Sequence, residues 1–161
     1  RAGFFLISLA VLLHFHFSKE EREQFLERFA AGKDPVLGFC ILGGIFSEGI
    51  DLVGERLVGA AVIGTGLPMV CNEREIQQHY FEEREGKGFA YAYLYPGMNK
   101  VQQAAGRVIR TMEDKGVILL LDDRFVTRQV VDTFPAEWDD YEVVTLQTVE
   151  ERIRRLWGNL Q

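Results

Sequence analysis

The chain has 161 residues, 47% of them hydrophobic and 26% charged, and its formal net charge is −6. A chain of this length can bury one good core but is short for two independent domains, and its mixed charges are not typical of a disordered tail. The acidic balance argues against a protein that coats nucleic acid with a general positive field, so any contact with DNA has to be local.

Two cysteines, Cys40 and Cys71, have no histidine or cysteine partner at metal-ligand spacing. The sequence therefore supports neither a zinc site nor a disulfide framework. We expect no metal ligands in this chain and a reducing, cytoplasmic environment.

The first segment, residues 2–17, is almost entirely apolar. A membrane span is the weaker interpretation, because about 20 apolar residues are needed to cross a bilayer and neither a basic cluster nor a clear cleavage site accompanies this run. The preferred interpretation is one or two buried strands in a sheet that is covered on both faces.

Helix-like and strand-like segments alternate after this start. Ser18 and Glu21 form a capping-box pattern ahead of an apolar stripe, which predicts a helix over residues 18–31 and a turn at residues 32–35. Continuous apolar runs of strand length then predict central parallel strands. These runs are residues 36–42, 58–63 and 117–121.

Two helices are predicted between the last two of these strands. Asn72 offers a cap for a surface helix of alternating charges that extends over residues 72–84. The breaker pair Pro96-Gly97 precedes a second helix over residues 99–112.

A strand at residues 142–146 and a helix at residues 149–157 complete the pattern. The sequence therefore predicts a single α/β domain over residues 1–161, with a mostly parallel sheet and helices on both faces. In such a layered domain, ligands are expected at the carboxyl ends of the strands.

A glycine-rich segment at residues 43–51 follows the first of the central strands. Glycines let a backbone approach a phosphate closely, the Ser47 hydroxyl is suited to donate to a phosphate oxygen, and Asp51 is suited to accept from a sugar hydroxyl. Glycines at strand ends are more often simple turn residues. Taken alone, the segment is a weak indication of a phosphate site.

The predicted helix after Pro96 carries a row of groups suited to an anion. Gln103, Arg107 and Arg110 are spaced four and three residues apart, which places them on one helical face. Guanidinium groups bind phosphate bidentately and stay charged, which suits a transferring phosphoryl group. An ordinary solvated face is the alternative, but Gly106 favours an anion site, because glycine destabilises an exposed helix and usually has a reason such as close backbone approach. The opposite, apolar face consists of Val101, Ala105, Val108 and Met112.

Two further sites have more ordinary interpretations. Asp122, Asp123 and Arg124 follow the last central strand, and we favour a helix cap over a link between the arginine row and the sheet. Trp138 and Trp157 are expected to anchor the core or the last helix rather than to stack on bases.

Residues 103–110, with the sequence QAAGRVIR, resemble motif VI of superfamily-two helicases. Residues 47–51, SEGID, resemble motif V in the form used by the XPD/DinG branch. The order and separation of the two motifs also fit, and the likeness is continuous over about residues 18–138. Further stretches that carry it are residues 66–68, 93–97 and 121–125.

This resemblance implies a RecA-like three-layer fold and the second motor domain of an ATP-dependent DNA helicase of the repair type. Arg107 and Arg110 match arginine fingers that act on ATP, which with Mg²⁺ is held mainly by a first RecA-like domain of the same protein. Positions that match nucleotide contacts are Gln103, Gly106, Gly49 and Asp51. Positions that match those coupling nucleotide state to single-stranded DNA are Ser47 and Glu48.

The sequence has no G-x-x-x-x-G-K-[ST] loop and no DEAH-like acidic box for Mg²⁺. By resemblance, this chain is expected to be inactive alone and to carry no iron–sulfur cluster. Residues 1–17 depart from the family pattern and are either truncated and altered or divergent. Two alternatives stay open: a non-catalytic module that binds nucleic acid or protein, and a regulatory domain of a nuclease or repair factor.

Overall fold

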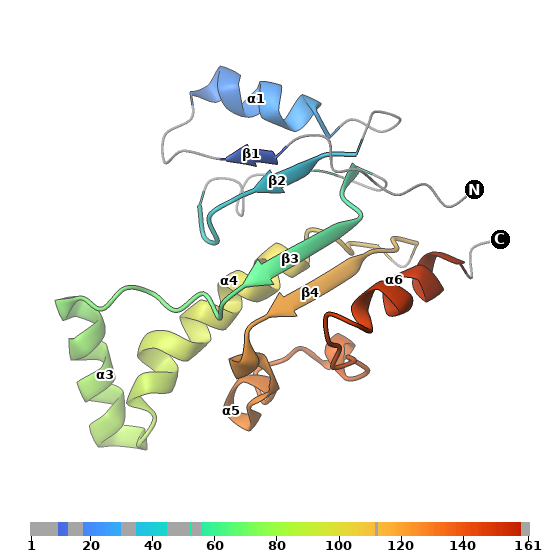
Figure 1. Cartoon of the computed structure of the whole chain (residues 1–161). Coiled ribbons are helices and arrows are strands. Elements are labelled where there is room, and N and C mark those ends of the chain that lie inside the picture. Colours follow the sequence, from blue (N-terminus) through green and yellow to red (C-terminus); the bar gives the residue numbers. More distant parts are fainter. Residues whose placement is uncertain are drawn as a thin grey trace.

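Two pairs of parallel strands organise the chain (Figure 1). In the computed structural model, β1 (Ala10–Leu12) pairs with β2 (Leu37–Phe39), and β3 (Gly59–Ile63) pairs with β4 (Val117–Leu121). The longer pair is in register from Gly59 opposite Val117 to Ile63 opposite Leu121. The structure describes residues 10–12, 18–29, 35–44, 52, 56–111 and 113–158.

The parallel pairing confirms the predicted α/β class, because parallel strands have to be joined by crossover connections. Among the described residues, however, the two strand pairs do not form one continuous sheet, because no ladder joins β2 to β3. β1 and β2 each contribute only three residues to their ladder, which leaves little edge for further pairing. The apolar start thus contains the expected strand at Ala10–Leu12, although most of residues 2–17 lies outside the described part.

The first crossover, α1 (Lys19–Glu27), begins with the predicted capping box. The backbone N–H of Glu21 donates to the Ser18 hydroxyl at 3.1 Å, and the backbone N–H of Ser18 donates to the Glu21 carboxylate at 2.8 Å. Arg56 caps the other end of the helix. Its guanidinium donates to the carbonyl oxygens of Leu26 and Phe29, both at 3.2 Å. The Leu26 carbonyl also accepts from the backbone N–H of Phe29 at 3.1 Å, so Arg56 adds a second donor at this helix end.

The second crossover consists of α3 (Asn72–Glu85), a π-helix (Ala90–Leu94) and α4 (Tyr95–Ala105). The bounds of α3 match the prediction closely, but its cap does not. Cys71, not Asn72, is the N-cap, and it makes no side-chain cap hydrogen bond. The helix ends at Gly86, whose φ of 64° lies in the left-handed region that favours glycine.

We expected the pair Pro96-Gly97 to break the helix, but Pro96 lies within continuous helix. It lies in the first turn of α4, which continues directly from the π-helix, so the helix predicted over residues 99–112 begins earlier, at Tyr95. Proline is compatible with this position because its fixed φ suits the start of an α-helix. The guanidinium of Arg74 on α3 donates to the backbone oxygen of Ala92, in the π-helix that precedes α4, at 3.2 Å.

The main core lies between α4 and the β3–β4 pair. Partly buried hydrophobic residues pack around it, and Trp138 is one of them, so it is a core anchor, as predicted. The others are Leu42, Ala104, Leu120 and Phe134. The edge-to-face contact of Trp138 with Phe134, at 5.2 Å between ring centroids, fixes this side of the core. The buried residues are Val62, Leu94, Met98, Val101, Phe125 and Val130.

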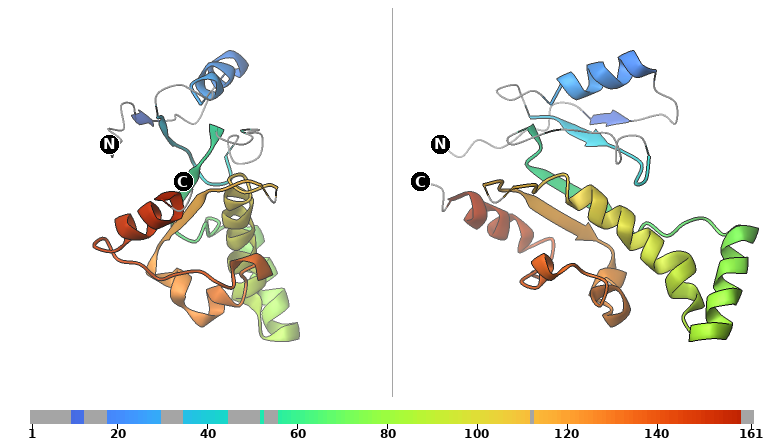
Figure 2. Two further views of the ribbon diagram at one scale, coloured as in Figure 1. Left: turned by 90° about the vertical axis from the view of Figure 1, so that its right-hand side faces the viewer. Right: turned by 180° about the vertical axis from the view of Figure 1, so that it is seen from behind.

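The opposite face of the β3–β4 pair is covered by α6 (Val149–Gly158), as two views of the chain show (Figure 2). This helix was predicted. The strand predicted at residues 142–146 is wrong, because these residues form no ladder and enter a turn at residues 146–148. An ion pair of 3.1 Å between Glu142 and Arg152 holds this segment to α6 instead of a neighbouring strand. No helix in the described ranges is long and apolar enough to span a bilayer.

Candidate functional site

The predicted anion-binding row begins on α4 but does not stay on it. Gln103 is exposed on the last turn of the helix, which ends at Ala105 with Gly106 as its C-cap. Arg107 and Arg110 therefore lie beyond the helix. The prediction that these three residues share one face of a single α-helix is wrong, since the 3.6-residue period stops before the first arginine.

The chain tightens where α4 ends. The backbone N–H of Arg107 donates to Ala104 at 3.2 Å and that of Val108 donates to Ala105 at 3.0 Å, so each bond spans three residues rather than four. Both arginines are half-buried and make further interactions within the chain. The apolar half of the prediction is confirmed for Val108, which is buried together with Val101 and Ala105, while Met112 lies outside the described residues.

Gly106 is the C-cap of α4. Its φ of −64° and ψ of −5° are open to any residue, and its N–H closes the last turn of α4 by donating to Gln102 at 2.8 Å. A Cβ at this position would lie 3.2 Å from the same Gln102 oxygen. A side chain here would therefore lie tight against the last turn of the helix.

A tight turn anchored by one carboxylate follows the helix end. Asp114 Oδ2 accepts hydrogen bonds from the backbone N–H of Arg110 at 2.9 Å and of Thr111 at 2.8 Å. The backbone N–H of Asp114 returns to the Thr111 carbonyl at 3.3 Å, and the Thr111 hydroxyl accepts from Glu113 at 3.3 Å. The bonds from Arg110 and Thr111 hold the pKa of Asp114 below its ordinary value of 3.8, because they stabilise the charged carboxylate.

Val108 and Gly116 lie beside the amino ends of β3 and β4. A Cβ on Gly116 would collide with the Val108 side chain and lie 3.2 Å from the Val58 carbonyl oxygen. The backbone N–H of Val117 donates to this carbonyl at 3.1 Å. Both arginines thus precede β4 in the chain, rather than following a strand at its carboxyl end, where we expected ligands to gather.

Part of the other predicted site, Ser47, Glu48, Gly49 and Asp51, lies outside the described residues. The turn that leads into it is described. Gly43 has a φ of 81°, and a Cβ at this position would lie 3.0 Å from Cδ of Lys100 on α4. The start of the glycine-rich segment therefore contacts the helix that leads to the two arginines.

Polar groups also meet at the carboxyl ends of β3 and β4. Arg124 Nε and Nη2 donate to the two carboxylate oxygens of Asp122, at 2.8 and 2.7 Å. Asp122 also accepts from the backbone N–H of Arg124 and is the N-cap of a short 3₁₀ helix (Asp123–Val126), which confirms the favoured cap interpretation. The hydrogen bonds from the side chain and then the backbone of Arg124 lower the pKa of Asp122 from 3.8 to about 2.

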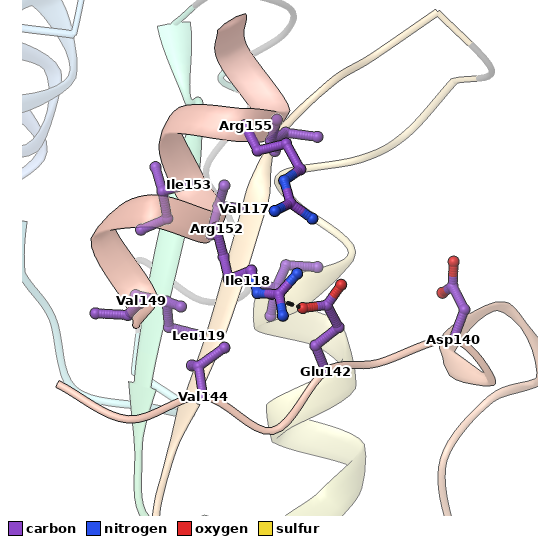
Figure 3. A pocket seen from close by; sticks show the side chains of 12 residues that line it. Val117, Ile118, Leu119, Asp140, Glu142, Val144, Val149, Arg152, Ile153 and Arg155 are labelled. Carbon is purple, nitrogen blue, oxygen red and sulfur yellow. Dashed lines mark ion pairs between the residues drawn. The ribbon is translucent and has the colours of Figure 1, made fainter. Parts of the chain in front are cut away.

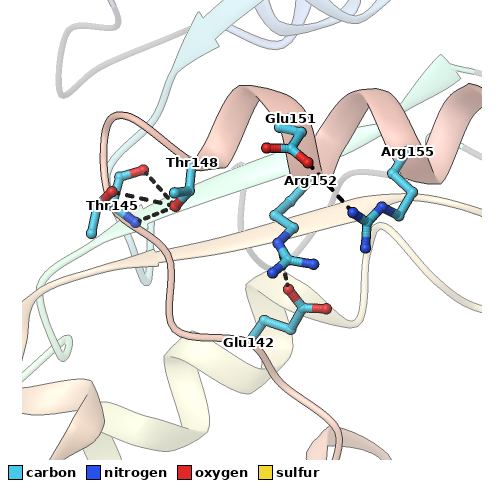
Figure 4. Close-up of polar contacts among 6 residues, drawn as sticks. All are labelled: Glu142, Thr145, Thr148, Glu151, Arg152 and Arg155. Atoms are coloured by element: carbon cyan, nitrogen blue, oxygen red, sulfur yellow. Dashed lines mark hydrogen bonds and ion pairs between the residues drawn. The ribbon is translucent and has the colours of Figure 1, made fainter.

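A pocket of about 490 Å³ lies between β4 and α6 (Figure 3). Its apolar wall includes Ile118 and Ile153, and its rim carries Glu142, Arg152 and Arg155. The rim is held by the Arg152 pair with Glu142 and by the Arg155 pair with Glu151 at 3.4 Å, next to a turn closed by Thr145 and Thr148 (Figure 4). None of the residues predicted to form the site lines this pocket.

No group of three histidine, cysteine or acidic residues that could hold a metal ion occurs in the part of the chain that the structure describes. Cys40 and Cys71 are free and exposed. The one residue near the arginines that sequence reasoning missed is Asp114. Its position four residues after Arg110 was visible in the sequence, but nothing in the pattern distinguished it from a solvated acidic side chain.

These features define a parallel α/β domain with an arginine-bearing connection between its last crossover helix and its last described strand. The sequence matches the helicase C-terminal domain family over residues 8–141, and the chain belongs to this family, within the XPD/DinG branch of helicases.

Three relatives illustrate the match. The chain is 29% identical over 138 residues to a probable ATP-dependent helicase of Methanocaldococcus jannaschii, covering 79% of this chain and 21% of the relative. It is 30% identical over 133 residues to the ATP-dependent DNA helicase YoaA of Escherichia coli, covering 81% and 20%. It is 35% identical over 88 residues to the ATP-dependent DNA helicase DinG of Photobacterium profundum, covering 53% and 13%. The chain thus spans about a fifth or less of the length of these relatives.

Proposed function

We propose that this chain is the second motor domain of an ATP-dependent DNA helicase, and that it acts with a first RecA-like domain of the same protein. Membership of the helicase C-terminal domain family and the printed names of the relatives support this assignment. The cover of the β3–β4 pair by α4 and α6 is consistent with a RecA-like three-layer arrangement.

Within this proposal, Arg107 and Arg110 are arginine fingers for ATP bound mainly by the first domain with Mg²⁺. A guanidinium beside the γ-phosphoryl group stabilises the negative charge that spreads over its oxygens during transfer. Gln103, together with Gly106, contacts the nucleotide from the end of α4. The chain alone lacks a phosphate-binding loop and is proposed to be inactive without its partner domain.

The glycine-rich segment completes the proposed cleft. Gly49 and Asp51 face the nucleotide, while Ser47 and Glu48 pass the nucleotide state to single-stranded DNA. Gly43, at the start of the segment, lies close to Lys100 on the helix that carries Gln103, which supports a common cleft for the two motifs. Hydrolysis then opens and closes the cleft and moves the strand across both domains.

The observation that carries the proposal is the fixed exit of α4. Buried Val108 holds the backbone between the two arginines, and the Asp114 turn holds it at and after Arg110. A finger has to meet a transferring phosphoryl group with its geometry already set, since reorganisation at the moment of reaction reduces the electrostatic benefit. A rigid helix exit meets this requirement without a continuous helical face.

The test is DNA-stimulated ATP turnover of the complete protein with Arg107→Ala or Arg110→Ala. We expect each change to lower turnover by about 10³- to 10⁵-fold, the range known for fingers, and to leave nucleotide binding mostly intact. Arg154→Ala is the matched control, because Arg154 is exposed on α6 and pairs only with Glu150 among the described contacts, at 2.7 Å. Unchanged turnover in both finger variants would reject the motor role in favour of a binding module.

A further inference from the structure

The turn after Val108 fixes the backbone of Arg110 through a side chain rather than through secondary structure. At Arg110 the chain has left α4, and the described residues of the connection, 110–111 and 113–116, belong to no helix or strand. An arginine in such a segment would ordinarily lose the orientation that a helix gives to its Cα–Cβ bond. Another restraint is therefore needed if the guanidinium is to point in one direction.

Asp114 supplies this restraint. Its Oδ2 atom accepts from the N–H of Arg110 and from that of Thr111, so two successive peptide planes are held against one oxygen. The carbonyl of Thr111 accepts from the N–H of Asp114, which ties the carboxylate back to the same turn. These three bonds restrict the torsions on both sides of the Arg110 and Thr111 peptide.

The turn is also held at its far end. Gly116 packs against the Val108 side chain with no room for a Cβ, and the next residue, Val117, begins β4. Val108 is itself 4% exposed. The connection that carries Arg110 is therefore packed against the core at both ends, at Val108 and at Gly116. Between these ends, Asp114 holds the backbone by hydrogen bonds.

We propose that Asp114 is a positioning residue for Arg110, holding the backbone from which this side chain reaches toward the γ-phosphoryl group. The inference rests on the proposed motor function and assigns part of its geometry to a residue outside motif VI. Asp114 does not touch the nucleotide in this arrangement. Its effect passes through hydrogen bonds to the Arg110 backbone and is distinct from any charge that it contributes near the guanidinium.

The charged state of the carboxylate suits this role. The pKa of Asp114 is lowered chiefly by the Arg110 and Thr111 N–H groups, so the carboxylate stays ionised throughout the neutral range and keeps its full capacity to accept hydrogen bonds. An asparagine in its place would keep an acceptor oxygen but lose the charge. An alanine would lose both.

The experiment compares Asp114→Ala and Asp114→Asn in the complete protein, with Asp132→Ala as a matched control. Asp132 is an exposed acidic residue whose ion pair with Arg128 is 3.8 Å long and remote in sequence from the arginine turn. Displacement of a reacting group by about 1 Å can cost roughly a hundredfold in rate. We expect Asp114→Ala to lower kcat of DNA-stimulated ATP turnover roughly ten- to a hundredfold with little change in KM for ATP, and Asp114→Asn to keep most of the rate.

Thermal melting of each variant separates positioning from loss of fold. If Asp114→Ala fails to fold, Asp114→Ser takes its place, because a serine hydroxyl is too short to bridge both N–H groups but leaves the surface polar. Equal losses in the Asn and Ala variants would overturn the proposal, since charge rather than backbone restraint would then matter. A normal kcat in the Ala or Ser variant would overturn it as well.

The outcome can be separated from failure of the motor assignment. If Arg110→Ala lowers turnover while Asp114→Ala does not, the finger stands and the positioning role falls. If Arg110→Ala has no effect, the proposed function of Arg110 itself is wrong. If both changes lower turnover, Asp114→Ala should add little in a protein that already carries Arg110→Ala, because positioning acts through that residue.

Discussion

Asp122 and Arg124 form a two-bond ion pair at the carboxyl end of β4, with nitrogen–oxygen distances of 2.8 and 2.7 Å. The Arg124 guanidinium also lies near Gly64, at the end of the neighbouring β3. The pair therefore lies next to the end of β3 and orients the 3₁₀ helix that follows β4. Bidentate pairs of this kind are more geometrically specific than single ion pairs.

This pair predicts a defined loss of stability in acid. The folded pKa of Asp122, about 2, is below the ordinary value of 3.8, so the carboxylate contributes stability above about pH 4 that is lost as the pH falls toward 2. Asp122→Asn should remove this contribution while keeping a side chain that can cap a helix. The measurement is the free energy of unfolding by denaturant between pH 7 and pH 2.

We expect the difference between native protein and Asp122→Asn to be constant near neutrality and to shrink below about pH 4. Asp139→Asn is the control, because Asp139 is exposed and begins no helix. A difference that stayed the same down to pH 2 would show that the Arg124 pair does not set the pKa of Asp122.

Arg74 predicts a second stability effect. Its guanidinium donates to the carbonyl of Ala92, a residue with 0% exposure. Arg74→Met would keep much of the apolar stem but remove the donor, and an acceptor left without a partner in a buried setting costs roughly 1–3 kcal/mol. The measurement is the free energy of unfolding in urea.

The matched control is Arg128→Met, because the Arg128 side chain is 94% exposed and its ion pair is long. Surface substitutions of this type usually change stability by less than about 0.5 kcal/mol. If the free energy of unfolding fell by the same amount in both variants, the hydrogen bond from Arg74 to Ala92 would contribute nothing specific to stability.

Two glycines with nearly the same φ predict different costs of substitution. Gly66 and Gly86 have φ values of 65° and 64°, in the region where alanine is strained by roughly 1–2 kcal/mol. At Gly86 a Cβ would meet nothing within 4 Å, whereas at Gly66 it would lie 2.9 Å from both the Gly97 carbonyl and the Leu42 side chain.

Gly66→Ala should therefore cost more than Gly86→Ala by roughly 1–3 kcal/mol, the usual penalty of overpacking. Unfolding of the two variants under identical conditions gives this difference directly, because the backbone strain cancels. Equal destabilisation would mean that the loop after β3 can move away from α4, contrary to the close packing described above.

Local patterns in the sequence were enough to predict several elements. The capping box at Ser18 and Glu21 depends on residues three apart, and the structure contains both of its hydrogen bonds. The apolar runs that became β3 and β4 are bounded by glycine or charged residues. The motif at residues 103–110 also identified the helicase family, because its residue types and spacing are unusually specific.

Tertiary contacts decided where α4 begins and ends. A proline at its first turn is compatible with either a break or a helix start, and only the packing of Met98 and Val101 against β3 and β4 selects the helix. At the other end, the sequence pattern continued past Ala105, but the chain has to turn there to enter β4. Long-range packing therefore removed Arg107 and Arg110 from the helix that their spacing predicted.

The sequence by itself determined the family and the identity of the arginine pair, since both depend on which residues occur and in what order. The tertiary structure decided that these arginines lie beyond the end of α4, and that Asp114 holds the turn after Arg110. The physical reason is that side-chain to backbone hydrogen bonds such as that from Arg110 to Asp114 form only after the flanking helix and strand fix the two ends of the turn.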